Sequence, residues 1–239
     1  MTLRMTRLAL ALLASMLLAS CLLAPGKFTS TLTINADRGF TYAYVGEVYG
    51  LDMDQMMKDM PGDGDKPAST QPVGWQKTPA KPAPAEPKED KDAANRAVAE
   101  ALSKEAGFRK VEYLGNNKFM IDYQIGGKLD HTFLFPYNID AGIIIPFIAV
   151  ELRANGTARV KAPGFANDAK AQGAGMEMGG SDAARAASKL DGVFTLDTDA
   201  EVVSQNNEDG VKTVGGRTTI AWKATPLSST APMAVLRFK

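Results

Sequence analysis

Apolar and polar residues alternate in several separate stretches of the chain, which is the periodicity of a β-strand with one buried face. Between residues 28 and 35, Phe28, Leu32 and Ile34 alternate with threonines. Asp37-Arg38-Gly39 supplies a turn, so residues 40–49 are predicted to form the partner strand of a hairpin. The same pattern predicts strands over 108–113, 119–125, 131–137, 148–152, 157–162, 193–204, 216–224 and 233–238.

Helical spacing of apolar residues is rarer than the strand pattern. Asp92 is a plausible N-cap for a helix through about Ala106, with Gly107 as the residue that ends it. Its expected apolar face consists of Ala94, Val98, Ala101 and Leu102. A second helix is predicted over Asp182–Leu190. Strand patterns outnumber helical ones and do not alternate with them regularly, so we expect an α+β fold with a mostly antiparallel twisted sheet and one principal helix.

Residues 61–92 differ from the rest of the chain, because they hold many prolines and charges and a single large apolar residue, Trp75. Such a segment cannot bury enough apolar surface to offset the entropy of ordering. The composition predicts a disordered Pro-rich insertion within a single domain that spans residues 21–239. One hypothesis for this segment is recruitment of a protein partner, which would make the protein an envelope assembly or scaffold protein.

The first twenty residues have the three parts of a secretory signal peptide. Arg4 and Arg7 give a positive start, residues 8–18 are almost entirely apolar, and Ala19 and Ser20 are small. The apolar run is shorter than the roughly 20 residues that a membrane-spanning helix needs. Residues 1–20 are therefore predicted to be removed from the mature protein.

Leu18-Ala19-Ser20-Cys21 resembles the lipobox of bacterial lipoproteins. The resemblance implies that Cys21 is acylated after cleavage before it, which would anchor the protein by two or three acyl chains. Leu22, in place of an aspartate, resembles the class sorted to the outer membrane, on its periplasmic face, and the inner membrane is the alternative. An ordinary secretory peptide with an incidental cysteine is the competing interpretation. The chain as a whole also resembles lipoproteins of alphaproteobacteria.

Composition narrows the possible chemistry. Cys21 is the only cysteine, so no intramolecular disulfide can form, and His131 is the only histidine. Without Arg4 and Arg7 the chain has 25 basic and 27 acidic residues, which argues against a nucleic-acid binder. No nucleophile elbow, phosphate loop or calcium loop is present, and His131 is interpreted as structural. We therefore expect a protein without enzymatic activity, metal or cofactor.

Two groups of residues are candidates for binding. The stretch Phe133–Val150 is the most apolar of the mature chain and could be core, the lining of a lipid-sized cavity, or a loop that dips into a membrane. The lipid-related interpretations make Phe133, Phe135, Ile144 and Phe147 candidate ligand-binding residues. The second group is a methionine stripe with helical spacing, which fits packing or, as a remote alternative, a Cu(I) site: Met53, Met56, Met57 and Met60.

The C-terminal region carries a further resemblance. Ser204-Gln205-Asn206-Asn207 is followed by a glycine-containing turn and by Thr218-Thr219-Ile220-Ala221-Trp222. With the early threonine-rich hairpin, this resembles the LppM-type lipoprotein domain. The resemblance implies a lipid-anchored α+β domain for which lipid binding is suggested. The expected function is that of a lipid-anchored envelope protein that binds a hydrophobic ligand or lipid.

Overall fold

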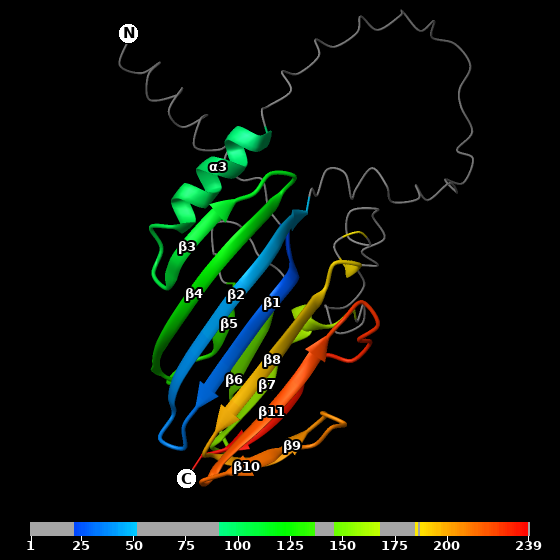
Figure 1. Ribbon diagram of the computed structural model, residues 1–239. Helices are drawn as coiled ribbons and strands as arrows, with labels where there is room; N and C mark the ends of the chain where they lie inside the picture. Colours follow the sequence, from blue (N-terminus) through cyan, green and yellow to red (C-terminus); the bar gives the residue numbers. More distant parts are fainter. Residues whose placement is uncertain (1–21, 52–90, 137–145, 168–184, 186, 239) are drawn as a thin grey trace, which may run out of the picture.

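Most of the chain that the structure describes lies in two β-sheets (Figure 1). The computed structural model describes residues 22–51, 91–136, 146–167, 185 and 187–238. The strands are β1 (Leu22–Ile34), β2 (Gly39–Leu51), β3 (Phe108–Tyr113), β4 (Lys118–Lys128), β5 (Phe133–Phe135), β6 (Ile148–Leu152), β7 (Thr157–Lys161), β8 (Asp191–Thr198), β9 (Glu201–Gln205), β10 (Lys212–Val214), β11 (Arg217–Ala224) and β12 (Met233–Arg237). The helix α3 (Lys91–Leu102) and the 3₁₀ helix η1 (Pro163–Phe165) accompany them.

The larger sheet has seven strands in the order β10-β11-β8-β1-β2-β4-β3. Its neighbouring strands are antiparallel except for β1 and β8, which are parallel, with Lys27 opposite Asp191 and Ile34 opposite Thr198. The smaller sheet has five strands in the order β5-β6-β7-β12-β9 and is antiparallel throughout. The sheet-rich fold with one principal helix was predicted from the sequence. A single sheet was expected, however, and the structure has two.

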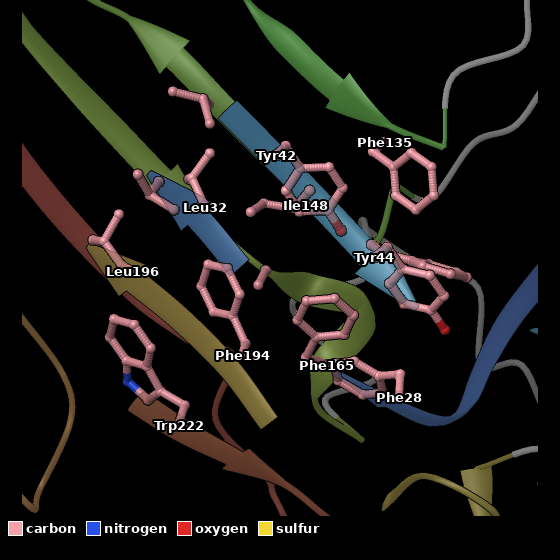
Figure 2. Packing of buried hydrophobic residues seen from close by; sticks show 14 of the residues in the cluster. Phe28, Leu32, Tyr42, Tyr44, Phe135, Ile148, Phe165, Phe194, Leu196 and Trp222 are labelled. Carbon is pink, nitrogen blue, oxygen red and sulfur yellow. The ribbon is translucent and has the colours of Figure 1, made fainter. Parts of the chain in front are cut away.

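The two sheets share one hydrophobic core. Alternate residues of β1, such as Leu32 and Ile34, are fully buried, and they meet Ile148, Val160 and Leu236 of the smaller sheet in the same cluster. Figure 2 shows aromatic rings filling the centre of this cluster. This division of each strand into a buried and an outer face is the physical origin of the alternation seen in the sequence.

Two tyrosines on β2 add polar atoms to this apolar core. The Ser30 hydroxyl donates a hydrogen bond to the hydroxyl oxygen of Tyr42, at 3.1 Å. The Tyr44 hydroxyl donates to the carbonyl of Glu47, at 2.9 Å. Burial raises the pKa of both tyrosines well above their usual range, so both rings remain neutral core residues.

Helix α3 differs from its prediction at both ends and in its buried face. It begins at Lys91, so Asp92 lies in the first turn, and it ends at Leu102 because the following amides of Lys104 and Glu105 bond three residues back. Gly107 does adopt a positive φ of 91°, but at the end of this turn. Ala99 is the buried residue of the helix, whereas Ala94, Val98 and Ala101 are exposed.

Hydrogen bonds of polar side chains orient helix α3 about its axis. The Asn95 side-chain amide donates to the Asn117 side-chain oxygen at 2.8 Å and to the Tyr113 hydroxyl at 3.4 Å, and Tyr113 donates to the Asp92 carboxylate at 2.5 Å. These bonds turn the face of Asn95 and Ala99 toward the β3–β4 turn. The predicted apolar face was therefore wrong by about one residue.

Most predicted strands are confirmed, with three corrections. β1 begins at Leu22 rather than Phe28, because the chain continues through a register shift between Pro25 and Phe28. The predicted strand 193–204 is two strands in different sheets, and between them the Ala200 amide donates to the Thr198 hydroxyl at 3.0 Å. The short strand β10 was not predicted, since Lys212–Val214 is too brief for a clear alternation.

Several predictions concern residues outside the described ranges. These are the acylation of Cys21, the methionine stripe of residues 53–60, the disorder predicted for residues 61–90, Ile144, and most of the helix predicted over residues 182–190. Residues 91 and 92 were assigned to the disordered insertion as well, but they belong to helix α3. Within the described ranges, no helix is both long and apolar enough to cross a bilayer.

Candidate ligand-binding groove

The described part of the apolar stretch 133–150 contributes to the core. Phe135 and Phe147 are 2% and 1% exposed, and Phe135 packs against Tyr123 with ring centroids 4.4 Å apart. Phe133 is half-buried beside Phe40, at 5.1 Å between centroids. Phe135 and Phe147 are therefore core residues, and Phe133 packs against the core, which is one of the three roles considered for this stretch. Ligand contact by the four candidate residues stays a prediction. Of the three candidates that the structure describes, Phe133, Phe135 and Phe147, none lines the groove described next.

An open groove of about 560 Å³ lies on the larger sheet. Its lining comes from β1, β2, β4, β8 and β11. The side chains involved alternate with core residues along each strand, so they point to the outer face, away from the smaller sheet. The apolar part of the lining is Val45, Met120 and Val193, and the charged part is Lys27, Asp191 and Lys223.

The apolar residues of the groove are unusual for their position. Val45 and Val193 are apolar although both lie on the solvent side of their strands, where they are 47% and 37% exposed. Thr29 stands between them, since it pairs with Val45 on one side and with Val193 on the other. Side chains on adjacent strands lie roughly 5 Å apart, so the three form a continuous weakly polar floor.

Glycines shape the sheet beneath this floor. Phe28 pairs with Gly46 on β2 and with Gly192 on β8. A Cβ atom on Gly192 would lie 2.4 Å from Phe28 Cδ1, and one on Gly46 would lie 2.5 Å from Phe28 Cβ. The two glycines therefore leave room for the Phe28 ring, which stacks on Phe165 with centroids 4.3 Å apart. This packing fixes β1 at the point where it passes under the groove.

The charged residues lie around Asp191. Lys27 is its register partner across the β1–β8 pair. Lys223 pairs with Val193, so it lies diagonally across from Asp191. All three side chains are exposed, and no ion pair among the described residues includes any of them. The groove consequently offers two ammonium groups and one carboxylate to a ligand.

Glu47 on β2 is the acidic residue nearest to the groove along that strand, and it already forms an ion pair with Lys118. Lys118 Nζ lies 3.2 Å from Glu47 Oε1, and the Tyr49 hydroxyl donates to Glu47 Oε2 at 3.2 Å. Partial burial alone would raise the pKa of this carboxyl, but the hydrogen bond and charge of Lys118, with the Lys27 backbone amide and Tyr49, lower it overall. Glu47 is therefore ionised and satisfied, and it leaves the Lys27 ammonium available.

His131 lies at the surface beside Asp130. Its Nδ1 contacts the Asp130 carboxylate, and both side chains are largely exposed, at 84% and 76%. The hydrogen bond to His131 lowers the pKa of Asp130. Among the described residues, no group of three or more His, Cys, Asp or Glu side chains is placed to hold a metal ion.

The asparagine turn that resembles the LppM-type domain has a structural role. Asn206 Oδ1 accepts from Trp222 Nε1 at 3.1 Å and from the Met233 amide at 2.8 Å. Its Nδ2 donates to the Ala231 carbonyl at 2.8 Å. Asn207 Nδ2 donates to the Ala221 carbonyl at 2.7 Å. These bonds join β11 of the larger sheet to β12 of the smaller one.

The groove was not predicted from the sequence, because each strand contributes at most three residues to it. No local motif links Lys27, Val45, Asp191 and Lys223, which come together only through the sheet order. One signal was available, namely apolar Val45 and Val193 at outward positions in the strand alternation. Such interruptions of a polar face are where exposed binding surfaces occur.

Two solved structures are among the chains to which this one is similar. The folded domain of LppM from Mycobacterium tuberculosis, determined by NMR, has 14% identity and a TM-score of 0.35, over 91% of this chain and 92% of that one. The M1 zinc metallopeptidase from Deinococcus radiodurans has 11% identity and a TM-score of 0.27, over 90% of this chain and 42% of the peptidase. The LppM domain expected from the sequence is thus among the structural neighbours.

No protein-family model matches the chain, and no curated protein matches it significantly. Both TM-scores are below 0.5, so the proposals below depend on the chain's own residues.

Proposed function

We propose that this chain is a lipid-anchored envelope protein that binds an amphiphilic lipid in the outer groove without changing it chemically. The observation that carries the proposal is the groove itself, where the apolar side chains of Val45, Met120 and Val193 are bordered by the ammonium groups of Lys27 and Lys223. Its volume of about 560 Å³ is within the range of small-molecule sites, roughly 300–1,000 Å³.

The proposed anchor supports a lipid ligand. Strand β1 begins at Leu22, the residue after Cys21, and Lys27 follows five residues later. A strand rises about 3.3 Å per residue, so the groove would lie within roughly 20 Å of the acylated cysteine. A domain held so closely has lipids within reach of its groove. We place it on the periplasmic face of the outer membrane, on the basis of the lipobox and Leu22.

A fluorescent fatty acid, dansylaminoundecanoic acid, tests this proposal. The protein used is the chain from Leu22 onward, which contains every strand and the helix described here. We expect saturable enhancement of dansyl fluorescence, and loss of at least tenfold in affinity in Val45→Asp, because a carboxylate in the floor disfavours an acyl chain.

Val214→Asp is the matched control, since Val214 is 81% exposed on β10, away from the groove. It should bind the probe as the unchanged chain does. Absence of saturable binding, or equal affinity in Val45→Asp and the unchanged chain, would overturn the proposal.

A further inference from the structure

The groove is bordered by charges of both signs. A purely anionic ligand would leave the Asp191 carboxylate without a partner, and a purely apolar ligand would leave all three charged groups without one. Asp191 lies between two lysines, with Lys27 on one neighbouring strand and Lys223 on the other. Directly paired residues lie about 5 Å apart and diagonal ones about 7–8 Å. A ligand of a few atoms could therefore contact a lysine and Asp191 at the same time.

These charges do not neutralise one another within the described structure. Lys27 and Asp191 are register partners, yet no ion pair joins them, and Glu47 is taken by Lys118. Carboxylate and ammonium groups that remain separate at the border of a groove are complementary to a ligand that carries both charges. A phosphate can be held by lysine ammonium groups, while a cationic group on the same ligand can be held by Asp191.

The lining also distinguishes between types of cationic group. Quaternary ammonium groups have no N–H donor and are commonly bound by cages of aromatic rings. Among the described residues that line the groove, the only aromatic one is Phe28, whose ring is buried against Phe165. A primary ammonium, in contrast, has three N–H donors that a carboxylate such as Asp191 accepts.

We infer that the groove recognises the headgroup of a phosphoethanolamine lipid. Lys27 and Lys223 hold its phosphate, Asp191 accepts hydrogen bonds from its primary ammonium, and the first part of its acyl chains lies on Val45, Val193 and Met120. This inference rests on the proposed function and adds the ligand class to it.

Three short-chain lipids below their micelle concentrations separate the headgroup from the acyl chains. They are dihexanoyl phosphatidylethanolamine, dihexanoyl phosphatidylcholine and dihexanoyl phosphatidic acid, titrated calorimetrically into the chain from Leu22 onward. We expect phosphatidylethanolamine to bind about tenfold more tightly than phosphatidylcholine. Asp191→Asn should remove this difference and leave the affinity for phosphatidic acid unchanged or higher.

Matched controls use the same substitutions away from the groove. Asp209→Asn and Lys212→Met change exposed residues in the region between β9 and β11, and both should retain the preference. Lys223→Met should lower the affinity for each of the three lipids by fivefold or more.

The outcomes separate the two proposals. Equal binding of the three lipids, or a preference that survives in Asp191→Asn, overturns the headgroup inference and leaves amphiphile binding in place. Absence of binding of any of the lipids, together with absence of binding of the dansyl fatty acid, overturns both.

Discussion

Asn206 Oδ1 accepts the indole N–H of Trp222 and the backbone amide of Met233, so a single amide oxygen joins strands of the two sheets. Trp222 is 8% exposed and stacks on Phe194 with centroids 5.5 Å apart. The bond therefore orients a large ring at the border of the core. Met233, the second donor to Asn206, begins β12, the strand that carries the fully buried Leu236.

Asn206→Ala should destabilise the domain by about 2–3 kcal/mol, because it leaves two N–H donors without their acceptor and removes the bond to Ala231. Urea denaturation of the chain from Leu22 onward measures this loss. Asn167→Ala is the control, since Asn167 is exposed and its side chain makes one long bond of 3.4 Å to Pro226. That variant should stay within about 0.5 kcal/mol of the unchanged chain. Equal midpoints for the two variants would contradict the role given to Asn206.

Gly192→Ala should cost about 1–3 kcal/mol, since the new methyl group would meet the ring and the carbonyl of Phe28 at less than van der Waals distance. Gly50→Ala provides the comparison, because the nearest atom to its new Cβ is 3.7 Å away. The second variant should be neutral or slightly stabilised through a less flexible unfolded chain. Thermal denaturation followed by circular dichroism distinguishes them, and a Gly192→Ala variant as stable as Gly50→Ala would refute the close packing of Phe28.

Glu47 should contribute to a dependence of stability on pH. Its pKa is lower in the folded protein than in the unfolded chain, so the folded state favours the ionised carboxylate. The stabilisation is present above the unfolded pKa, about 4.3, and is lost as the pH falls through the lower folded value. Glu47→Gln should flatten the decrease in unfolding free energy between about pH 5 and pH 3.

Glu201→Gln is a suitable comparison for Glu47→Gln. Glu201 pairs with Arg237 at 2.9 Å, but both side chains are more than half exposed, and such exposed pairs contribute little. Its stability profile should therefore follow that of the unchanged chain. Superimposable profiles for Glu47→Gln and the unchanged chain would contradict the pairing of Glu47 with Lys118.

Cys21→Ser should release the protein from envelope membranes, because the acyl chains that the lipobox predicts could no longer be attached. Fractionation of cells, with the variant and the unchanged protein followed by immunoblot, measures the distribution. Metabolic labelling with an alkyne-tagged palmitate gives an independent readout. Label incorporated into the Cys21→Ser variant, or equal membrane association without label, would contradict lipidation at this position.

The parts of the fold predicted well from sequence are those in which one strand has one buried face. Residues 119–125 and the hairpin of residues 28–49 belong to this group, since their alternation directly reflects burial. The strand predicted over 193–204 failed because no glycine or proline marks the point where the chain leaves one sheet for the other. The helix face failed because Asn95, a polar residue, determines its orientation. Neither cause appears in an apolar pattern.

The groove could not be predicted for a different reason. Its residues come from five strands, and Lys27 and Asp191 become neighbours only through the parallel pairing of β1 with β8. Sequence patterns report on periods of two to four residues, whereas this pairing joins distant segments. The apolar stretch 133–150 gave the stronger sequence signal, and its described residues Phe135 and Phe147 are in the core.

The parallel pairing of β1 and β8 also has a consequence for how the protein is made. Lys27 meets Asp191 only after 164 further residues have been synthesised. Until then β1 has β2 on one side and an open backbone edge on the other, which is a template for wrong pairing with another chain. Such long-range contacts slow folding, so the centre of the larger sheet is completed late. A chain that stops before Asp191 would keep this edge open, and we expect it to aggregate or be degraded.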